Sequence, residues 1–178
     1  MRTHRFLLPI VALVAAGLAG CGSSSKAPGV EQAPSSGATA TTVPTTPKPP
    51  PAIAKKPVVN VPTGPAPAKL LTKDLVVGTG ATAKAGDTVT VNYVGVLYKT
   101  GKEFDSSWKT GQPTSFPLTP GGLIQGWVQG IPGMKVGGRR ELIVPASLAY
   151  GTRGSPPSIP PNAPLVFVVD LLSTSSSS

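Results

Sequence analysis

The stretch GGLIQGWVQGI, residues 121–131, decides the fold class because it is the one segment whose apolar residues recur at helical spacing. These residues lie three and four positions apart, as on one face of a helix: Leu123, Ile124, Trp127, Val128 and Ile131. Glycine is a poor helix former and tryptophan is the largest apolar side chain, so helix propensity does not explain Trp127 between Gly126 and Gly130. We expect both glycines to clear space around a ring that is buried against another layer.

The segments around this helix alternate between apolar and polar residues, which is typical of strands. The clearest is DTVTVNYVGVLY, residues 87–98, which puts Val89, Val91 and Tyr93 on one face. Gly101 can supply the positive φ of the hairpin turn that follows. Further candidate strands are residues 70–78, which alternate weakly, 139–146 and 164–172. The pattern predicts an α+β domain, in which one short helix buries its apolar face on a mostly antiparallel sheet.

The N-terminus has the order of a secretory signal peptide over residues 1–20. A basic start, MRTHR, precedes an apolar run that is short for a membrane span, and LAGC, residues 18–21, ends in the chain's only cysteine. LAGC resembles the lipobox of bacterial lipoproteins, in which the cysteine is lipidated and becomes the first residue after cleavage. We therefore expect Cys21 to carry lipid and to anchor the mature chain to the bacterial membrane, outside the cytoplasm. The alternative is a secreted protein with a free thiol.

Prolines are concentrated in residues 22–68, where aromatic residues are absent. Such a segment buries too little apolar surface to offset the conformational entropy lost on folding. We predict a lipid-anchored disordered tether over residues 21–68, a globular domain over 69–174 and a disordered Ser tail over 175–178. The PKPPP run favours a semi-rigid polyproline II spacer, and a ligand for a partner domain is the alternative.

Charge and histidine content exclude several classes of function. The chain has a net charge of +9, and removal of Arg2 and Arg5 with the signal peptide leaves about +7. These charges are scattered and include no basic run with interleaved aromatic residues, so nucleic acid is not an expected partner. The only histidine, His4, is lost with the signal peptide. A Ser-His-Asp triad, a Cys-His pair and a His-rich metal site are therefore excluded from the mature domain, and no cofactor is expected.

Three stretches then resemble a known family: VNYVGVLYKTGKEFDSS (91–107), LIQGWVQGIPGMKVGGRRELIVPASLAYG (123–151) and IPPNAPLVFVVDLL (159–172). Together they resemble the FKBP-type peptidyl-prolyl cis-trans isomerases over nearly all of residues 70–172. The order and spacing of FDSS, IxGW, MxxG, AYG and IPPN make the likeness specific. It implies a curved sheet, or half-barrel, wrapped around one short α-helix, with a proline-binding pocket between them. It further implies proline-containing polypeptides as substrates, macrocyclic inhibitors as a further ligand class, and a monomer.

The resemblance also implies the residues of the site. The catalytic positions are Tyr93, Phe104, Asp105 and Tyr150. The substrate-binding positions are Leu123, Ile124, Trp127, Ile159 and Phe167. The resemblance implies that a substrate proline rests on Trp127 and that the Ile124 N–H holds a substrate carbonyl. It also implies that the Tyr150 hydroxyl forms a hydrogen bond with the substrate backbone. Asp105 supplies polarity without donating a proton. From the residue pattern alone, Phe167 is predicted to be part of the sheet core and Asp105 to be a carboxylate that caps a turn.

Two positions at the pocket rim depart from the family pattern. Thr110 stands where many members have an arginine, and Thr114 stands where many have an aromatic wall. We therefore expect Asp105 to lack its usual charge partner, with Lys109 as a substitute, and we expect a thinner pocket wall. In the loop TRGSPPSIPPN, Ser155 and Ser158 replace larger side chains of eukaryotic members, which makes inhibitor affinity harder to predict than isomerase activity.

The leading hypothesis is a peptidyl-prolyl cis-trans isomerase that assists the folding of exported proteins. Its pocket would bind the twisted X-Pro amide, so no nucleophile or metal is required. The first alternative is a proline-recognising chaperone or binding module with little turnover. The second is a structural envelope lipoprotein on an isomerase scaffold that has lost its activity. All three hypotheses keep the same pocket motifs, because fold and function are separate claims.

Overall fold

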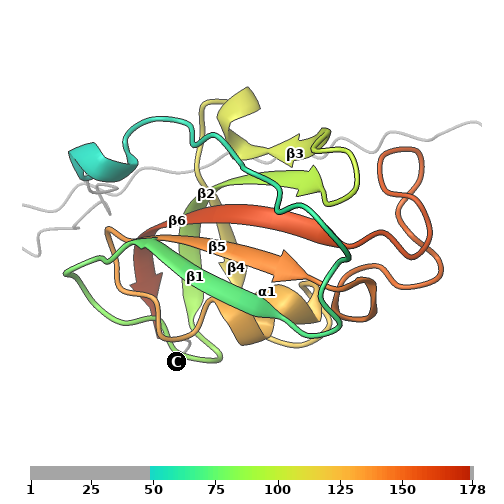
Figure 1. Cartoon of the computed structure of the whole chain (residues 1–178). Coiled ribbons are helices and arrows are strands. Elements are labelled where there is room, and N and C mark those ends of the chain that lie inside the picture. Colours follow the sequence, from blue (N-terminus) through green and yellow to red (C-terminus); the bar gives the residue numbers. More distant parts are fainter. Residues whose placement is uncertain (1–48, 177–178) are drawn as a thin grey trace, which may run out of the picture. The chain divides into compact units, whose positions relative to one another are not determined.

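The computed structural model describes residues 49–176, whose elements are labelled in Figure 1. In chain order they are η1 (Pro51–Ile53), β1 (Leu71–Val76), β2 (Thr88–Leu97), β3 (Glu103–Ser106), η2 (Ser107–Lys109), β4 (Thr114–Pro117), α1 (Gln125–Gly130), β5 (Arg139–Val144), η3 (Ala146–Leu148) and β6 (Leu165–Ser175). The predicted signal peptide, Cys21 and most of the predicted tether lie outside the described residues. Within the described part, no helix is long and apolar enough to cross a membrane.

All strands pair antiparallel in one sheet, in the order β1-β5-β6-β2-β3, and β4 pairs with the first half of β2. The centre of the sheet is the long β2·β6 pair, which runs from Thr88↔Ser175 to Leu97↔Leu165. The predicted α+β class with a single short α-helix is confirmed. Strands β3 and β4 were not predicted as strands, because four residues are too few to show an alternating pattern.

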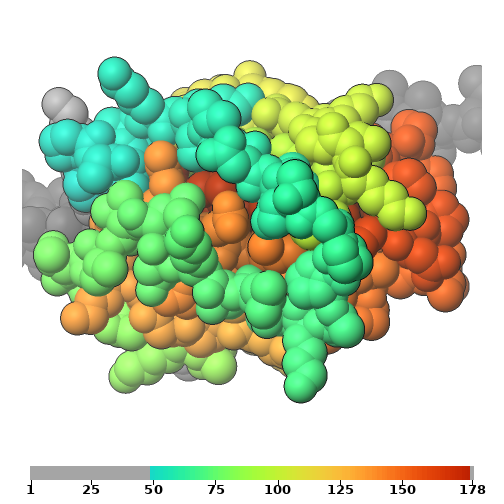
Figure 2. All heavy atoms as spheres, viewed as in Figure 1, coloured from blue at the N-terminus to red at the C-terminus, as the bar shows by residue number. Residues whose placement is uncertain are grey.

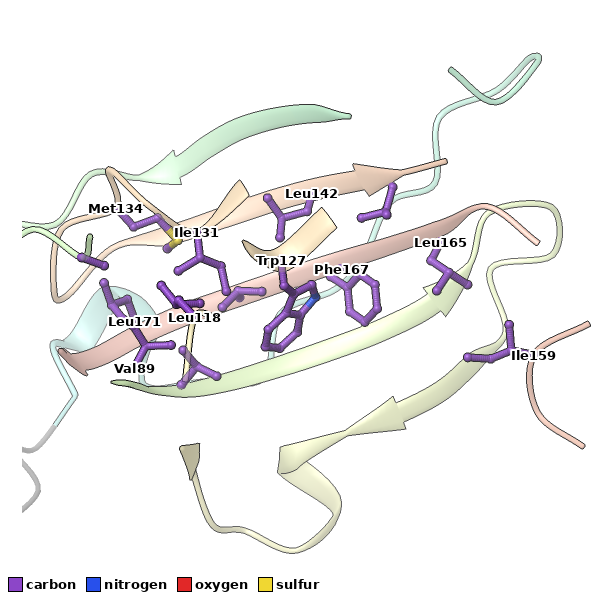
Figure 3. Close-up of a cluster of buried hydrophobic side chains, with 14 residues drawn as sticks. Val89, Leu118, Trp127, Ile131, Met134, Leu142, Ile159, Leu165, Phe167 and Leu171 are labelled. Atoms are coloured by element: carbon purple, nitrogen blue, oxygen red, sulfur yellow. The ribbon is translucent and has the colours of Figure 1, made fainter. Parts of the chain in front are cut away.

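The helix α1 covers one face of this sheet, which we call the inner face (Figure 1). The core lies between the two, with Trp127 only 3% exposed near its centre (Figure 3). The fully buried members of this core are Val89, Val91, Ile131, Leu142, Val144, Leu165, Val169 and Leu171. Alternate residues of β2, β5 and β6 therefore supply the inner layer, as period two requires.

Two glycines set the close approach of α1 to β5. A Cβ at Gly126 would collide with the methyl groups of Val144, and one at Gly130 would lie 2.7 Å from Leu142 Cδ2. The expectation that these glycines make room for the ring is confirmed, since the helix could not otherwise lie close enough to bury Trp127 on the sheet. The helix begins only after Ile124, which has extended backbone and is the N-cap.

An arginine fixes the other end of α1. The Arg140 guanidinium donates to the carbonyl oxygen of Gly130 at 2.8 Å and to that of Pro132 at 3.3 Å. The same group bonds both carboxylate oxygens of Asp74 on β1, and this contact lowers the pKa of Asp74. A six-residue helix is marginal by itself, so packing and this arginine hold it in place.

The opposite, outer face of the sheet is crossed by residues 50–66, which we call the strap (Figure 1). Ile53 of the strap is fully buried. Val59, Val61 and Ala66 pack against a second apolar cluster, formed by Val94, Val96, Tyr98, Ile143 and Val166. The packed chain thus begins well before the predicted domain start at residue 69, inside the segment predicted as a disordered tether. The difference arises because a few well-spaced apolar side chains suffice when a sheet face lies ready to receive them.

Candidate active site

A cavity of about 550 Å³ opens between α1 and the inner face of the sheet. It is lined by Tyr93, Phe104, Asp105, Phe116, Gly121, Gly122, Leu123, Ile124, Gln125, Trp127, Ala149, Tyr150 and Phe167. All the predicted site residues except Ile159 are in this set. The structure therefore brings together residues from β2, β3, β6, the start of α1 and the loop after η3, as the motifs predicted.

The indole of Trp127 forms the floor of the cavity, and three aromatic rings stand on it. The rings of Tyr93, Phe116 and Phe167 lie 5.3, 5.3 and 5.4 Å from the indole at interplanar angles of 84°, 84° and 85°. Phe104 stands edge-on to Phe167 at 5.6 Å. Edge-to-face packing of this kind is favourable. None of the three rings stacks flat on the indole. Together these rings and the indole form an apolar pocket with a flat floor, which we call the aromatic box.

A β-bulge explains how two consecutive residues both reach the cavity. Gly95 pairs with Asp105 and Val96 pairs with Glu103, so Phe104 is an extra residue in β3. Two residues of a bulged strand then oppose one residue of the partner strand, and the usual alternation is broken. Gly95 is required opposite them, because a Cβ there would lie 2.7 Å from the Phe104 ring and 2.8 Å from the Phe167 ring.

The polar side of the cavity is a tyrosine–aspartate pair. The Tyr93 hydroxyl donates a hydrogen bond of 2.6 Å to Asp105 Oδ2, and the Ser106 N–H donates to Asp105 Oδ1 at 2.8 Å. Burial and this hydrogen bond raise the pKa of Tyr93 well above its ordinary value. Burial, followed by the nearby charge of Asp105, also raises the pKa of Tyr150. Both phenols therefore keep their protons at neutral pH.

Ile159 is the one predicted pocket residue that does not line the cavity. Only 4% of the residue is exposed, it belongs to the inner core, and it is absent from the cavity lining. Its backbone exchanges hydrogen bonds with Ser155, which closes the loop between them. The structure thus gives Ile159 a core position that supports the loop after Tyr150.

Lys109, the expected substitute partner for Asp105, pairs with another carboxylate. Lys109 lies 3.6 Å from Glu103 Oε1 and makes no ion pair with Asp105 among residues 49–176. Thr110, at the position of the family arginine, donates its hydroxyl to the Ser107 carbonyl oxygen and so closes η2. In the absence of an arginine, Asp105 is satisfied by a phenol and a backbone amide.

Phe116, two residues after Thr114, lines the cavity as a further aromatic wall. It faces the same side of β4 as Thr114, and its ring packs edge-on against Trp127 and, at 6.1 Å, against Tyr93. The thinner wall expected at Thr114 itself stays a prediction. Sequence reasoning missed Phe116, although its period-two relation to Thr114 was a usable signal. Gln125 and Ala149 also line the cavity and were not predicted, because neither residue type nor its spacing marks a binding site.

The polar groups of the site do not form a metal centre. Within residues 49–176, no three His, Cys, Asp or Glu side chains are placed to hold an ion together. What the arrangement offers is a flat apolar floor, aromatic walls and a few hydrogen-bonding groups at the rim. These features suit an apolar ring that carries a polar amide beside it, and in proteins that description fits proline.

Comparison with known proteins agrees with this geometry. Residues 80–172 match the profile of the family described as FKBP-type peptidyl-prolyl cis-trans isomerase. A probable FK506-binding protein of Corynebacterium glutamicum is 53% identical over 119 residues, which is 67% of this chain and 98% of the relative. An FK506-binding protein of Streptomyces anulatus is 55% identical over 119 residues, covering 66% of this chain and 96% of the relative.

A solved structure adds the fold. The peptidyl-prolyl cis-trans isomerase of Pseudomonas syringae pv. tomato matches with a TM-score of 0.55 and 36% identity, over 68% of this chain and 84% of that one. The family match over residues 80–172 contains the helix and every residue that lines the cavity. This chain therefore belongs to the FKBP-type peptidyl-prolyl cis-trans isomerase family, and it is a peptidyl-prolyl cis-trans isomerase.

Proposed function

We propose that this isomerase is held at a membrane by a lipid on Cys21 and acts, outside the cytoplasm, on X-Pro bonds of exported proteins as they fold. The observation that carries the catalytic part is the aromatic box, with Trp127 as a floor on which three rings stand edge-on. The anchoring part is supported by the sequence alone, through the LAGC motif and the apolar run before it.

The box lowers the barrier by preferring the twisted amide. Rotation about an X-Pro bond breaks amide resonance and meets a barrier of about 18–20 kcal/mol, so that the uncatalysed reaction takes tens to hundreds of seconds. A twisted amide has less charge separation than a planar one, so an apolar, water-poor cavity stabilises it relative to water. Catalysis then consists of binding the rotated state more tightly than either planar state.

The individual residues take separate parts in this scheme. The substrate proline rests on Trp127, between the rings of Tyr93, Phe104 and Phe167, and the entrance is lined by Leu123. The pair of Tyr93 and Asp105 fixes the polar side of the cavity through its 2.6 Å hydrogen bond. Asp105 orients the amide through its charge and transfers no proton. Because the rings are already packed in the free protein, little ordering remains to oppose substrate binding.

Two groups are available to hold the substrate backbone. The Ile124 N–H precedes the first turn of α1 and makes no hydrogen bond with any group in residues 49–176. The Tyr150 hydroxyl is likewise without a hydrogen bond in that part of the chain, and the residue is 40% exposed at the rim. We assign the N–H to the carbonyl that follows the proline ring and the phenol to the carbonyl of the bond that rotates. These contacts fix the peptide on either side of that bond.

We extend the proposal to macrocyclic ligands. The relatives from Corynebacterium glutamicum and Streptomyces anulatus are named as FK506-binding proteins. A cavity of about 550 Å³ with the Phe116 ring among its walls is in the range that buries a drug-sized molecule. Competition between FK506 and a proline peptide for the full chain tests this extension. Saturable competition supports it, and unchanged peptide turnover at high macrocycle concentration contradicts it.

Mass spectrometry tests the anchor. The N-terminal peptide of the protein isolated from membranes is expected to begin at Cys21 with lipid attached, and a Cys21→Ser variant is expected to leave the membrane fraction. An unmodified Cys21 in the culture medium would contradict the anchored form. Isomerase activity of the Cys21→Ser variant serves as the control, because the box lies far along the chain from residue 21 and is expected to work without the anchor.

A further inference from the structure

The strap makes defined contacts with the outer face of the sheet along its whole length. Near its start Ile53 is fully buried, and the Lys55 carbonyl oxygen accepts a hydrogen bond of 2.8 Å from Arg139 Nη2 on β5. Arg139 also donates to the buried carboxylate of Asp170, at 2.8 Å to Oδ2. Near its end, the Pro65 carbonyl oxygen accepts from the Tyr98 hydroxyl at 3.3 Å. In Figure 2 the strap, cyan to teal, lies over the orange and red atoms of β5 and β6.

Strand β3, which carries two residues of the box, is the element of the site with the weakest backbone support. It has four residues, lies at the edge of the sheet and contains the bulge at Phe104, so its ladder with β2 is short and interrupted. Its far end is fixed to β2, because Ser106 Oγ donates to the Tyr93 carbonyl oxygen and the Tyr93 N–H donates to Ser107 Oγ. The Glu103 end is joined to β2 by the hairpin turn and by the hydrogen bond of the Leu97 N–H to the Lys102 carbonyl oxygen, but within residues 49–176 it has no such pair of side-chain bonds to β2.

The strap supports the Glu103 end from the outer face. Lys56 Nζ lies 2.7 Å from Glu103 Oε2, directly before Phe104 in the chain. Glu103 is opposite Val96, which belongs to the outer cluster, whereas Gly95 next to it faces the Phe104 and Phe167 rings of the box. Trp108, just after β3, packs on the same outer cluster as Val59 and Val61 of the strap. The strap and the box therefore contact opposite faces of one short segment, residues 103–108.

We propose that the strap is a positioning element of the isomerase site, with Lys56 and Glu103 as positioning residues that hold Phe104 and Asp105 at the cavity through β3. Neither residue touches the substrate. The inference rests on the isomerase activity and is independent of the lipid anchor. It gives the proline-rich segment before the domain a part in catalysis as well as in spacing the domain from the membrane.

The expected effects follow from the kinds of contact involved. The Lys56–Glu103 pair is partly exposed, with 44% and 27% of the two side chains accessible, so its loss is expected to be mild. The apolar contacts of Val59 and Val61 cover part of the outer cluster, and their loss is expected to loosen the strap between Lys56 and Pro65 more than the loss of the ion pair. A shift of about 1 Å in a positioned group can lower a rate by as much as about 100-fold, so small displacements of Phe104 and Asp105 are measurable.

The test uses variants of the full chain assayed at 10 °C, far below their unfolding transitions. We expect Lys56→Met to lower kcat/KM about threefold and the double variant Val59→Ser with Val61→Ser to lower it about tenfold. Matched controls on the strap are Lys55→Met, whose side chain makes no ion pair among residues 49–176, and Val58→Ser, whose side chain is 82% exposed. Leu171→Val, in the inner core, controls for lost stability and is expected to lower Tm without lowering kcat/KM.

Two further measurements separate positioning from a merely structural role. In a double-mutant cycle, adding Lys56→Met to Glu103→Gln is expected to lower kcat/KM no further, because one contact is removed twice. Amide hydrogen exchange at Phe104 and Asp105 is expected to become several-fold faster in the strap variants and to stay unchanged in Leu171→Val. The proposal is overturned if kcat/KM and exchange at these amides are unchanged in both Lys56→Met and the valine double variant. If the wild-type chain shows no turnover, the isomerase activity itself is refuted. Amide hydrogen exchange at Phe104 and Asp105 then decides by itself whether the strap holds β3.

Discussion

The Tyr93 hydroxyl lies 2.6 Å from Asp105 Oδ2 and donates a hydrogen bond to it across the edge of the cavity. This bond joins β2 to β3 through side chains at the point where the backbone ladder is interrupted by the bulge. It also takes the place of the arginine that Thr110 replaces, since a hydrogen bond to a carboxylate is stronger than one between neutral groups. Orientation of Asp105 thus depends on a phenol that is itself a wall of the box.

The first prediction concerns this phenol. Tyr93→Phe keeps the ring against Trp127 and removes the hydrogen bond to Asp105, so we expect kcat/KM to fall about tenfold, the effect of losing about 1.4 kcal/mol from a charged hydrogen bond. The unfolding free energy is expected to change by less, because Asp105 remains in contact with solvent. Thr90→Val is the control, since it removes a hydroxyl of the same strand that bonds Ser115 Oγ at 2.9 Å, and neither residue lines the cavity. Equal losses of activity in the two variants would contradict the assigned role.

The second prediction is a pH dependence. The pKa of Tyr93 is raised in the folded protein, whereas an unfolded tyrosine titrates near about 10. The folded state therefore holds its proton more tightly, and this contribution to stability is present below about pH 10 and lost as the pH rises through the raised pKa. Denaturant unfolding from pH 8 to pH 11.5 is expected to show the wild-type chain losing stability above pH 10 more steeply than Tyr93→Phe. Parallel curves for the two proteins would be evidence against the raised pKa.

The third prediction tests which residue of β4 forms the wall. Phe116→Ala removes a ring that stands on the indole of Trp127 and on the Tyr93 ring, and is expected to raise KM about tenfold. Thr114→Ala leaves those ring contacts intact and is expected to change KM less than about twofold. Steady-state kinetics with one proline peptide compare the two. A larger effect at Thr114 than at Phe116 would contradict the assignment of Phe116 as a wall of the cavity.

The fourth prediction concerns the approach of α1 to β5. Helix propensity alone predicts that Gly126→Ala stabilises the protein by about 1 kcal/mol. Because the new methyl group would collide with Val144, we expect instead a net loss of about 1–3 kcal/mol and a lower kcat/KM, as the floor of the cavity moves off the sheet. Gln129→Ala, at an exposed position of the same helix, is the control. Stabilisation by Gly126→Ala would show that the helix is free to move without harm.

Much of the fold follows from periodicity. The period-two runs containing Val89, Val91 and Leu171 are buried strands, and the segment with spacing three and four that contains Trp127 is the only α-helix of the described residues. The box could be assigned because its motifs keep their order and spacing. Period two cannot reveal an inserted residue, however, so the bulge that brings Phe104 and Asp105 to one side was not predictable from alternation.

The strap and the wall were missed for related reasons. Ile53, Val59 and Val61 are isolated apolar residues in a proline-rich segment, and composition averaged over that segment predicts disorder. The burial of Val59 and Val61 depends on an outer sheet face formed by residues far away in the sequence, such as Val166. Phe116 lies in a four-residue strand, which is too short for its period-two relation to Thr114 to stand out from the sequence around it. Ile159 was placed in the site by its motif; its packing in the inner core could not be predicted from the motif, and its part in substrate binding stays a prediction.

The central claim is tested most directly by the cis-to-trans isomerisation of a short peptide with an apolar residue before proline, in the presence of the full chain. If the aromatic box catalyses isomerisation, the rate rises in proportion to protein concentration above the uncatalysed rate, whose relaxation takes tens to hundreds of seconds. We also predict that Phe104→Ala, which removes a ring of the box, lowers this rate far more than it lowers stability. A rate equal to the uncatalysed one at every protein concentration, with the peptide still bound, would contradict the account and leave a proline-recognising binding module in its place.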